Sequence, residues 1–279
     1  MDRIKRIAAI NDLSGASRCS LTVALPVISA LGIQCTVMPT AILSNHTGYD
    51  EFFFEDYTDR MSEFTKNWQK MDLRFDSIYS GFLGSHKQIE TVLDFISKFK
   101  NKDTKIIVDP VMGDNGKIYS TYTKELCDDM KHLAAKADIV TPNITEACVL
   151  SGEKYESEAV EEPKLLKMAE KISSLGAKNV IITGLRSEGK VANFVYSDGK
   201  YKSFASRAVP KYFSGTGDVF SSLIAGLSCL GADIFKSTEF ATDFVHKATE
   251  LSFELGLHEN EGICFEKLLQ LLTEIKEVI

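Results

Sequence analysis

A Gly-Thr-Gly-Asp sequence at residues 215–218 stands directly before an apolar run with helical spacing. The run comprises Val219, Phe220, Leu223, Ile224, Leu227 and Leu230, and Gly231 marks its expected end. A helix that begins between Thr216 and Asp218 presents unpaired backbone N–H groups and the positive end of its dipole at its first turn. Gly215 and Gly217 let a ligand approach this backbone closely. The sequence therefore predicts that Gly215, Thr216 and Gly217 bind an anion, with phosphate as the expected ligand.

Asp218 has two interpretations at this position. As a helix N-cap it would stabilise the helix by roughly 1 kcal/mol, and aspartate is common there. As a general base it would accept the proton of a hydroxyl group that attacks a phosphoryl group at the same helix end. The second interpretation requires the rest of the chain to supply the other parts of a phosphoryl-transfer site.

Two carboxylates lie at and just after the end of an apolar strand predicted at residues 105–109. Asp109 comes directly after Ile106-Ile107-Val108, and Asp114 lies five residues further along the exit loop. Both carboxylates could face a Mg²⁺ ion or its waters, because Mg²⁺ prefers oxygen ligands. Aspartate before proline also opens ordinary turns, so this motif alone leaves a structural role open.

Two further strand ends carry residues suited to the same chemistry. Asn143 and Glu146 follow a strand at a spacing that places both on one face of a short helix, where they could support a bound metal ion. A capping box at the start of that helix is the alternative. Thr183 and Gly184 end an apolar strand with a hydroxyl and a glycine, which suits contact with a phosphate oxygen.

The hydrophobic periodicity predicts the elements that would bring these strand ends together. Strands are predicted at residues 4–10, 33–38, 77–80, 105–109, 138–141 and 179–183, a hairpin at 191–196 and 200–204, and helices at 17–31, 90–99, 124–134, 164–175, 237–255 and 265–279. This alternation indicates an α/β fold of three layers, with a mostly parallel central sheet between helices. Ligands in such folds lie beyond the carboxyl ends of the strands. No linker interrupts the chain, so we expect one domain over residues 1–279.

Residues 40–62 fit neither a helical nor a strand period well. They could form a small flap over the site, and the start of a surface helix is the alternative. The aromatic residues at 52–54 could serve as a flap or dimer contact, although burial in the core is the ordinary role of phenylalanine.

Composition limits the classes of partner. A chain of 279 residues with 44% hydrophobic residues and a formal net charge of −7 is typical of a globular protein. The negative charge argues against a nucleic-acid-binding surface and against binding to an anionic membrane. The six cysteines lack the spacing of metal sites and indicate reduced thiols. No signal-peptide pattern precedes the first strand, and we expect a cytoplasmic location.

Five sequence motifs resemble those of a known family. They are Leu43-Ser44-Asn45-His46-Thr47-Gly48-Tyr49, Ser80-Gly81-Phe82-Leu83-Gly84-Ser85, Asp109-Pro110-Val111-Met112-Gly113-Asp114, Thr141-Pro142-Asn143-Ile144-Thr145-Glu146 and Gly215-Thr216-Gly217-Asp218. Over nearly its full length the chain resembles the ribokinase-like kinases and, within them, the vitamin B6 kinases. The motif at residues 215–218 is typical of the superfamily, whereas the motifs at residues 43–49 and 109–114 indicate the B6 branch.

The resemblance implies ATP-dependent phosphorylation of the 5′-hydroxymethyl group of pyridoxal, pyridoxine or pyridoxamine. It makes Asp218 the base and the backbone of residues 215–218 the anion hole. It places Asp109, Asp114 and Glu146 in the Mg²⁺ region, Thr183 near the phosphates and Thr47 near the acceptor ring. From the residues themselves we expect Asn143 and Gly184 to contact the nucleotide, and Asp12 and Phe82 to contact the acceptor. ATP and Mg²⁺ are the expected cofactors, together with a monovalent cation such as K⁺, and a homodimer is the expected assembly.

Two departures from the B6-kinase pattern bear on the substrate. Phe82 stands where family members commonly have tyrosine, so it can stack on a ring but offers no hydroxyl. Asp12 lies in a loop that resembles the hydroxymethylpyrimidine kinases of thiamine synthesis. Its charge would favour a cationic acceptor such as pyridoxamine, and a simple turn residue is the alternative. A hydroxymethylpyrimidine kinase and a non-catalytic B6-binding protein therefore remain the alternatives.

Overall fold

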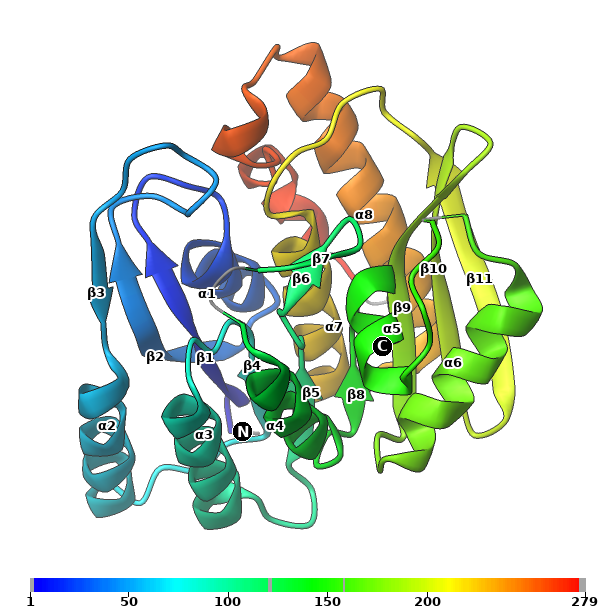
Figure 1. The fold of residues 1–279 in the computed structure, drawn as a ribbon. Helices are drawn as coiled ribbons and strands as arrows, with labels where there is room; N and C mark the ends of the chain where they lie inside the picture. The colour runs from blue at the N-terminus through cyan, green and yellow to red at the C-terminus, as the bar shows by residue number, and fades with distance from the viewer. Residues whose placement is uncertain (1–2, 120–121, 158, 276–279) are drawn as a thin grey trace.

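A nine-stranded sheet forms the centre of the computed structural model, which describes residues 3–119, 122–157 and 159–275 (Figure 1). Its order is β11-β10-β9-β8-β5-β4-β1-β2-β3. The strands are β1 (Arg6–Ser14), β2 (Gln34–Leu43), β3 (Phe54–Asp56), β4 (Ser77–Ser80), β5 (Lys105–Val108), β8 (Ile139–Val140), β9 (Asn179–Ser187), β10 (Lys190–Ser197) and β11 (Lys200–Arg207). The strands from β9 to β2 in this order pair in parallel, whereas β3 and the β10–β11 hairpin add antiparallel edges. The carboxyl ends of the parallel strands consequently meet at one edge of the sheet.

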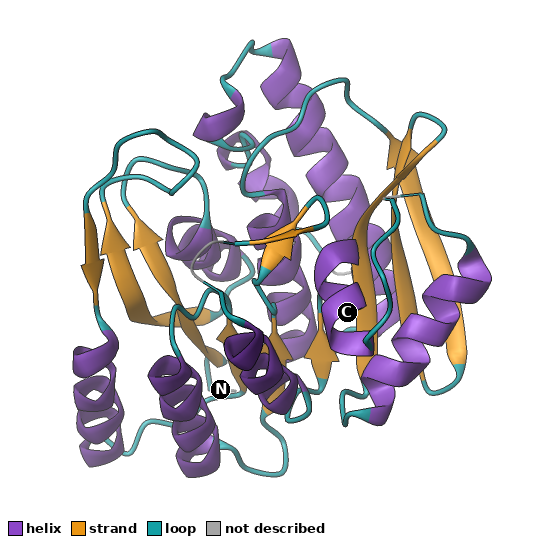
Figure 2. Ribbon diagram, viewed as in Figure 1, coloured by secondary structure: helices purple, strands orange, loops and turns teal. Residues whose placement is uncertain are grey.

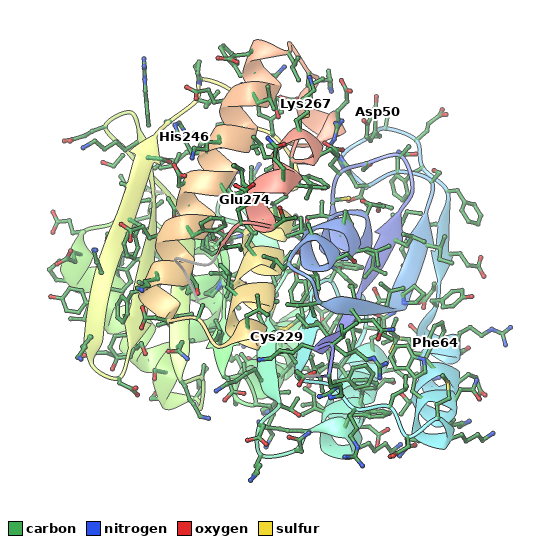
Figure 3. All side chains as sticks on the ribbon, turned by 180° about the vertical axis from the view of Figure 1, so that it is seen from behind. Asp50, Phe64, Cys229, His246, Lys267 and Glu274 are labelled. Atoms are coloured by element: carbon green, nitrogen blue, oxygen red, sulfur yellow. The ribbon has the colours of Figure 1, made fainter. Side chains whose placement is uncertain are left out.

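Helices cover both faces of the sheet (Figure 2). One face packs against α2 (Thr58–Lys70), α3 (His86–Phe99), α4 (Lys124–Ala134), α5 (Ile144–Ser151) and α6 (Glu162–Ser174). The other face packs against α1 (Ser20–Ala30), α7 (Thr216–Leu230), α8 (Ile234–Glu254) and the 3₁₀ helix η2 (Glu266–Leu272). Figure 3 shows this second layer from behind, with Cys229 on α7, His246 on α8 and Lys267 in η2. The expected three-layer αβα architecture is therefore confirmed.

The central strands are apolar on both faces because each face meets a helical layer. In β1, Ile7 and Ala9 belong to the hydrophobic core beside α1 and α7, whereas Ala8 and Ile10 belong to the core on the opposite face. This period of two follows from the alternating direction of side chains along a strand. Short continuous apolar runs are typical of parallel strands buried in this way, which is why they could be located from the sequence.

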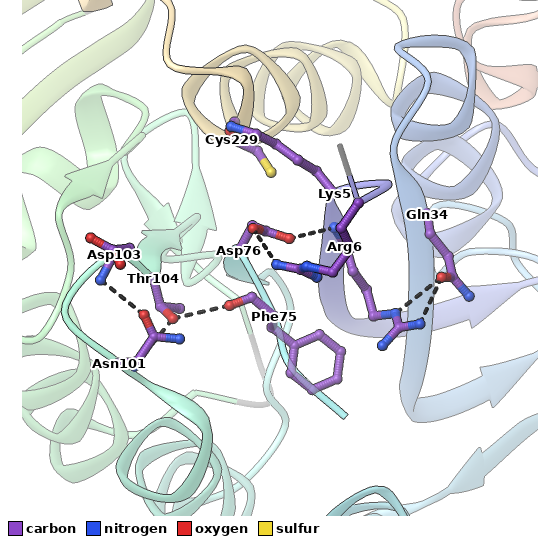
Figure 4. A network of polar contacts seen from close by, with 10 residues as sticks. Lys5, Arg6, Gln34, Phe75, Asp76, Asn101, Asp103, Thr104 and Cys229 are labelled. Atoms are coloured by element: carbon purple, nitrogen blue, oxygen red, sulfur yellow. Dashed lines mark hydrogen bonds and ion pairs between the residues drawn. The ribbon is translucent and has the colours of Figure 1, made fainter. Parts of the chain in front are cut away.

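Polar contacts fix the strand ends opposite the site (Figure 4). Asp76, just before β4, accepts hydrogen bonds from the Arg6 backbone N–H at 2.8 Å and from Arg3 Nη2 at 2.7 Å. The Thr104 hydroxyl, just before β5, donates to the Phe75 carbonyl at 3.0 Å. These bonds join the amino ends of β1, β4 and β5. They help to align the three strands, whose carboxyl ends carry site residues.

Most predicted elements are present with small shifts in their ends. The predictions for α4, β4 and the β10–β11 hairpin are confirmed. The C-terminal α-helix predicted at residues 265–279 is wrong, because residues 266–272 form the 3₁₀ helix η2, and residues 276–279 lie outside the described residues. An apolar residue at every third position satisfies both helix types, so the pattern could not separate them.

Residues 40–62 divide among several elements. β2 extends to Leu43, β3 occupies residues 54–56, and α2 begins at Thr58, as the alternative of a surface helix predicted. Residues 44–53 form the connecting loop, which lies at the carboxyl edge of the sheet (Figure 1). A small hairpin of β6 (Gly113–Asp114) and β7 (Lys117–Ile118) was not predicted from the sequence.

Candidate active site

A cavity of about 1140 Å³ runs along the carboxyl edge of the sheet. Every candidate residue identified in the sequence lines it: Asp12, Thr47, Phe82, Asp109, Asp114, Asn143, Glu146, Thr183, Gly184, Gly215, Thr216, Gly217 and Asp218. Single small-molecule sites usually measure about 300–1,000 Å³. The cavity therefore has room for two substrates side by side, as a group-transfer reaction between them requires.

The two glycines at the start of α7 have different roles. Gly215 is the N-cap in a left-handed conformation with φ of 77°, and a Cβ there would lie 1.9 Å from the Arg18 carbonyl oxygen. Gly217 is exposed and has no atom of another residue within 4 Å of an added Cβ. Gly215 is thus required by the packing of two backbones, whereas Gly217 leaves the N-terminus of α7 open to the cavity.

Asp218 lies in the first turn of α7 and is half-buried. Gly215 holds the N-cap position, so Asp218 is not the N-cap, and the capping interpretation is wrong. Burial raises the pKa of Asp218 to about 8, and the negative charges of Asp109 and Asp12 act in the same direction. Hydrogen bonds from the Ser20 backbone and the Asn11 side chain oppose this rise. A carboxyl with a pKa near neutrality is well matched to accepting and releasing a proton.

Asp12 is held by two serines at the exit of β1. Its Oδ1 accepts a hydrogen bond from the Ser20 hydroxyl at 2.6 Å, and its Oδ2 accepts one from the Ser14 hydroxyl at 2.7 Å. Burial raises the pKa of Asp12, and these two bonds counteract the rise. Ser20 adopts φ of 52°, which is rare for a residue other than glycine. This backbone conformation lets Ser20 interact with both Asp12 and Asp218.

Glu146 closes a capping box at the start of α5. Its Oε2 accepts from the Asn143 backbone N–H at 2.8 Å, while the Asn143 side chain accepts from the Glu146 N–H at 3.0 Å. Its Oε1 accepts from the Met112 N–H at 3.0 Å, so both oxygens bind backbone amides. Burial raises its pKa, followed by the charge of Asp109. The capping alternative is confirmed for this pair, and Glu146 ties the loop after β5 to α5.

Asp109 and Asp114 present their carboxylates differently. Asp109 is only 7% exposed, and burial raises its pKa while a hydrogen bond from Ser221 lowers it. Asp114 is exposed in β6, and its side chain accepts from the Asn115 N–H at 2.8 Å. Within the described ranges, no three acidic, histidine or cysteine side chains are close enough to hold a metal ion by themselves. Any cation here would need ligands beyond these side chains, such as water or phosphate oxygens.

Asn11 was missed by the sequence analysis. Its Oδ1 accepts from the backbone N–H groups of Asp12 at 3.0 Å and of Phe82 at 2.8 Å, which joins the exits of β1 and β4. A Cβ at Gly81 would lie 2.2 Å from the Asn11 amide nitrogen. The glycine before Phe82 was therefore the available sequence signal, but its partner lies some seventy residues away and only the fold reveals it.

The end of the cavity near β9 to β11 also contains residues that the sequence did not single out. Arg186, Arg207 and Lys211 line this end, and the Arg186 guanidinium lies 3.9 Å from the centre of the Tyr212 ring. The Asn193 side chain accepts from the Gly184 N–H at 3.1 Å and donates to the Thr242 hydroxyl at 2.8 Å. Cations therefore concentrate at this end, whereas Asp12 and Asp56 line the end near β1 to β3.

Known proteins are similar to this chain over most of its length. A family model described as phosphomethylpyrimidine kinase matches residues 24–263. Pyridoxal kinase from Dictyostelium discoideum is 29% identical over 216 residues, covering 71% of this chain and 70% of that protein. Hydroxymethylpyrimidine/phosphomethylpyrimidine kinase from Aquifex aeolicus is 34% identical over 190 residues, covering 66% and 71%.

A solved structure covers nearly the whole chain. A protein from Bacteroides thetaiotaomicron, assigned as a phosphomethylpyrimidine kinase and crystallised with pyridoxal, superimposes with a TM-score of 0.92. It is 38% identical and covers 97% of this chain and 96% of that chain. None of the helices in the described part of the chain is long and apolar enough to span a bilayer. The chain belongs to the phosphomethylpyrimidine kinase family and lies in the vitamin B6 kinase branch of the ribokinase-like superfamily.

Proposed function

We propose that this protein transfers the γ-phosphoryl group of ATP to the 5′-hydroxymethyl group of a B6 vitamer. The observation that carries the proposal is the position of Asp218 in the first turn of α7, beside the open approach at Gly217 and inside a cavity large enough for two substrates. A base and an anion-binding backbone at one helix end are the parts that phosphoryl transfer to a hydroxyl needs.

The reaction follows from this placement. The acceptor oxygen attacks the γ-phosphorus, its O–H proton passes to Asp218, and the bond between the γ-phosphorus and the bridging oxygen of ADP breaks. The negative charge on the transferring group faces the N–H groups of Thr216 and Gly217 and the positive end of the α7 dipole. The proton later leaves Asp218 for solvent, and the products are ADP and a phosphate monoester.

Mg²⁺ fits the acidic middle of the cavity. Asp109 and Asp114 supply carboxylate oxygens there, whereas both oxygens of Glu146 already accept backbone N–H bonds. We therefore assign Asp109 and Asp114 to the ion, directly or through water, and give Glu146 the role of orienting their loop. Bound with ATP, the ion would neutralise phosphate charge beside these carboxylates. A requirement for K⁺ stays a prediction.

The charge distribution in the cavity orients the two substrates. Arg186, Arg207 and Lys211 favour the polyphosphate at the β9 to β11 end, with Thr183 and Gly184 beside it. Phe82 and Thr47 lie towards the β1 to β3 end, where an aromatic acceptor can stack. Asp218 stands between the two ends, at the place where the acceptor hydroxyl would meet the γ-phosphate.

A B6 vitamer is the acceptor we favour. The Bacteroides thetaiotaomicron relative was crystallised with pyridoxal, and this chain has the same fold at 38% identity. The acidic acceptor end, with Asp12 and Asp56, would favour pyridoxamine, whose aminomethyl group is protonated near neutral pH. Because serine hydroxyls bind both oxygens of Asp12, we expect its effect to come mainly from its charge.

Hydroxymethylpyrimidine is the second candidate acceptor. The family description and the Aquifex aeolicus relative favour it. A panel of pyridoxal, pyridoxine, pyridoxamine and hydroxymethylpyrimidine with ATP and Mg²⁺, followed by ADP release, separates the two activities. Preference for the pyrimidine by about tenfold in kcat/KM, or about 1.4 kcal/mol, would overturn the B6 assignment. Failure to release ADP with every acceptor would favour a non-catalytic B6-binding protein. The homodimer, the cytoplasmic location and the single domain over residues 1–279 stay predictions.

A further inference from the structure

A short segment at residues 258–262, which we call the clasp segment, touches the loop that follows β2. The Asn260 side chain donates from Nδ2 to the Gly48 carbonyl at 2.8 Å. The Asn260 carbonyl in turn lies 2.8 Å from His46 Nε2. The two bonds hold both sides of the loop tip to one residue, although more than two hundred positions separate them in the chain.

His46 is in the tautomer that this arrangement requires. Its Nδ1 accepts the Gly48 backbone N–H at 3.0 Å, so this nitrogen carries no proton. Nε2 of the neutral ring must therefore carry the proton and donate it to the Asn260 carbonyl. Both ring nitrogens of His46 are thus engaged in ordering the loop.

The clasp segment also holds the approach to the anion-binding turn. The Glu259 carbonyl accepts the Ser214 N–H at 3.0 Å and the Ser214 hydroxyl at 3.1 Å. Ser214 directly precedes Gly215, the N-cap of α7. The clasp segment therefore contacts both the loop on the acceptor side and the turn that would bind the transferring phosphate.

The clasp segment is joined directly to the buried core. The residues after it, Ile263, Cys264 and Phe265, are buried in the core, and the Cys264 N–H donates to the Ser252 hydroxyl of α8 at 2.7 Å. Residues 44–53, by contrast, contain no helix or strand. Ser44 and Phe53 pair at the base of this loop, through the Ser44 N–H to the Phe53 carbonyl at 3.2 Å and the Phe53 N–H to the Ser44 hydroxyl at 2.9 Å. Residues 46–48, the loop tip, are bound to other parts of the chain by Asn260 and by a hydrogen bond from the His46 N–H to the Ser17 hydroxyl at 3.2 Å.

We propose that Asn260 is a positioning residue. It keeps residues 46–48 closed over the acceptor and at a fixed distance from the phosphate-binding turn. Thr47, between the two tethered residues, lines the cavity, so release of the tip would displace it from the acceptor. Release would also admit water to the γ-phosphate, because an ordered loop is what excludes solvent from such a site. The inference rests on the proposed kinase function.

The test is Asn260→Ala, with Asn67→Ala on the exposed side of α2 as the matched control. For Asn260→Ala we expect the KM for pyridoxal to rise about tenfold, the size expected when one ordering hydrogen bond is lost. The KM for ATP should stay within about twofold and kcat within about threefold of wild type. ADP release without acceptor, divided by release with saturating pyridoxal, should rise several-fold. The control should match wild type in every parameter.

Three results would overturn the inference. The first is an active, folded Asn260→Ala enzyme with unchanged acceptor KM and unchanged acceptor-free ADP release. The second is a loss of all activities in proportion to the folded fraction, which would make the contact merely structural. If Asn260→Ala does not fold, His46→Phe removes the other hydrogen bond to Asn260 and must raise the KM for pyridoxal without raising the KM for ATP. The third result is that neither variant folds. A wild-type enzyme without ADP release for any acceptor would instead refute the kinase function itself.

Discussion

The Arg18 carbonyl oxygen occupies the space that a side chain at Gly215 would need, since an added Cβ would lie 1.9 Å from it. Gly217, two residues further, faces open space. Substitutions at these two glycines should therefore affect different properties: stability at Gly215 and catalysis at Gly217. Gly215→Ala should lower the melting temperature by several degrees, because the clash and the left-handed φ both destabilise the fold.

Gly217→Val should lower activity strongly and stability little. The side chain has room in the fold but would project where phosphate approaches the α7 N-terminus. We expect kcat/KM to fall at least about 100-fold, with the melting temperature within about 2 °C of wild type. Thermal melts and steady-state kinetics on both glycine variants check this. Activity that merely tracks the folded fraction in Gly217→Val would assign that glycine to folding alone.

Asp114→Ala tests the metal region. Asp114 is exposed and bonded to Asn115, so its loss should leave the fold intact. We expect a higher Mg²⁺ concentration for half-maximal rate, by about tenfold, because a hard cation loses one oxygen ligand or a ligand to its water. Asp114→Asn keeps the size of the side chain, removes only the charge and serves as the comparison. An unchanged Mg²⁺ titration would remove Asp114 from the site.

The charge of Asp12 should affect the choice among vitamers. Asp12→Asn keeps an oxygen that can accept from one serine and removes the negative charge. The ratio of kcat/KM for pyridoxamine over pyridoxal should fall several-fold in this variant, since the aminomethyl group loses its electrostatic partner. Asp56→Asn provides a second acidic position at the same end of the cavity. A ratio that stays constant in both variants would mean that these carboxylates do not contribute to the choice between pyridoxamine and pyridoxal.

The sheet was predictable because buried parallel strands leave continuous apolar runs between helical segments, and the Gly215 to Asp218 turn was predictable from its local glycines. The contacts of Asn11 with Phe82 and of Asn260 with Gly48 were not, because each joins segments distant in the chain. Glu146 shows a different limit. Its spacing from Asn143 fits a capping box and a metal site equally well, and only the two backbone bonds to its oxygens separate these roles.

The pH dependence of kcat/KM should reflect the raised pKa of Asp218. Burial and nearby carboxylates favour the neutral acid, so the free enzyme holds this proton up to about pH 8, where the pKa lies. A base must be deprotonated, and kcat/KM should therefore rise as pH increases towards and through that value. By the same sign, the stability contributed by the neutral carboxyl is fully present below the unfolded-state pKa of about 3.9, falls as pH rises from there through about 8, and is gone above that value, so Asp218→Asn should melt no lower than wild type above about pH 8. A flat profile between about pH 6 and 9 would contradict this assignment.

The central claim is that Asp218 accepts the proton of the acceptor hydroxyl, and single-turnover phosphoryl transfer by Asp218→Asn tests it most directly. Enzyme saturated with ATP, Mg²⁺ and the best acceptor of the panel is mixed and quenched, and the phosphorylated acceptor is quantified. We predict a rate constant at least about 100-fold below wild type, with ATP affinity and melting temperature preserved, because asparagine keeps the size of the side chain but cannot take the proton. A rate constant within about threefold of wild type would contradict the account and leave Asp218 without a chemical role.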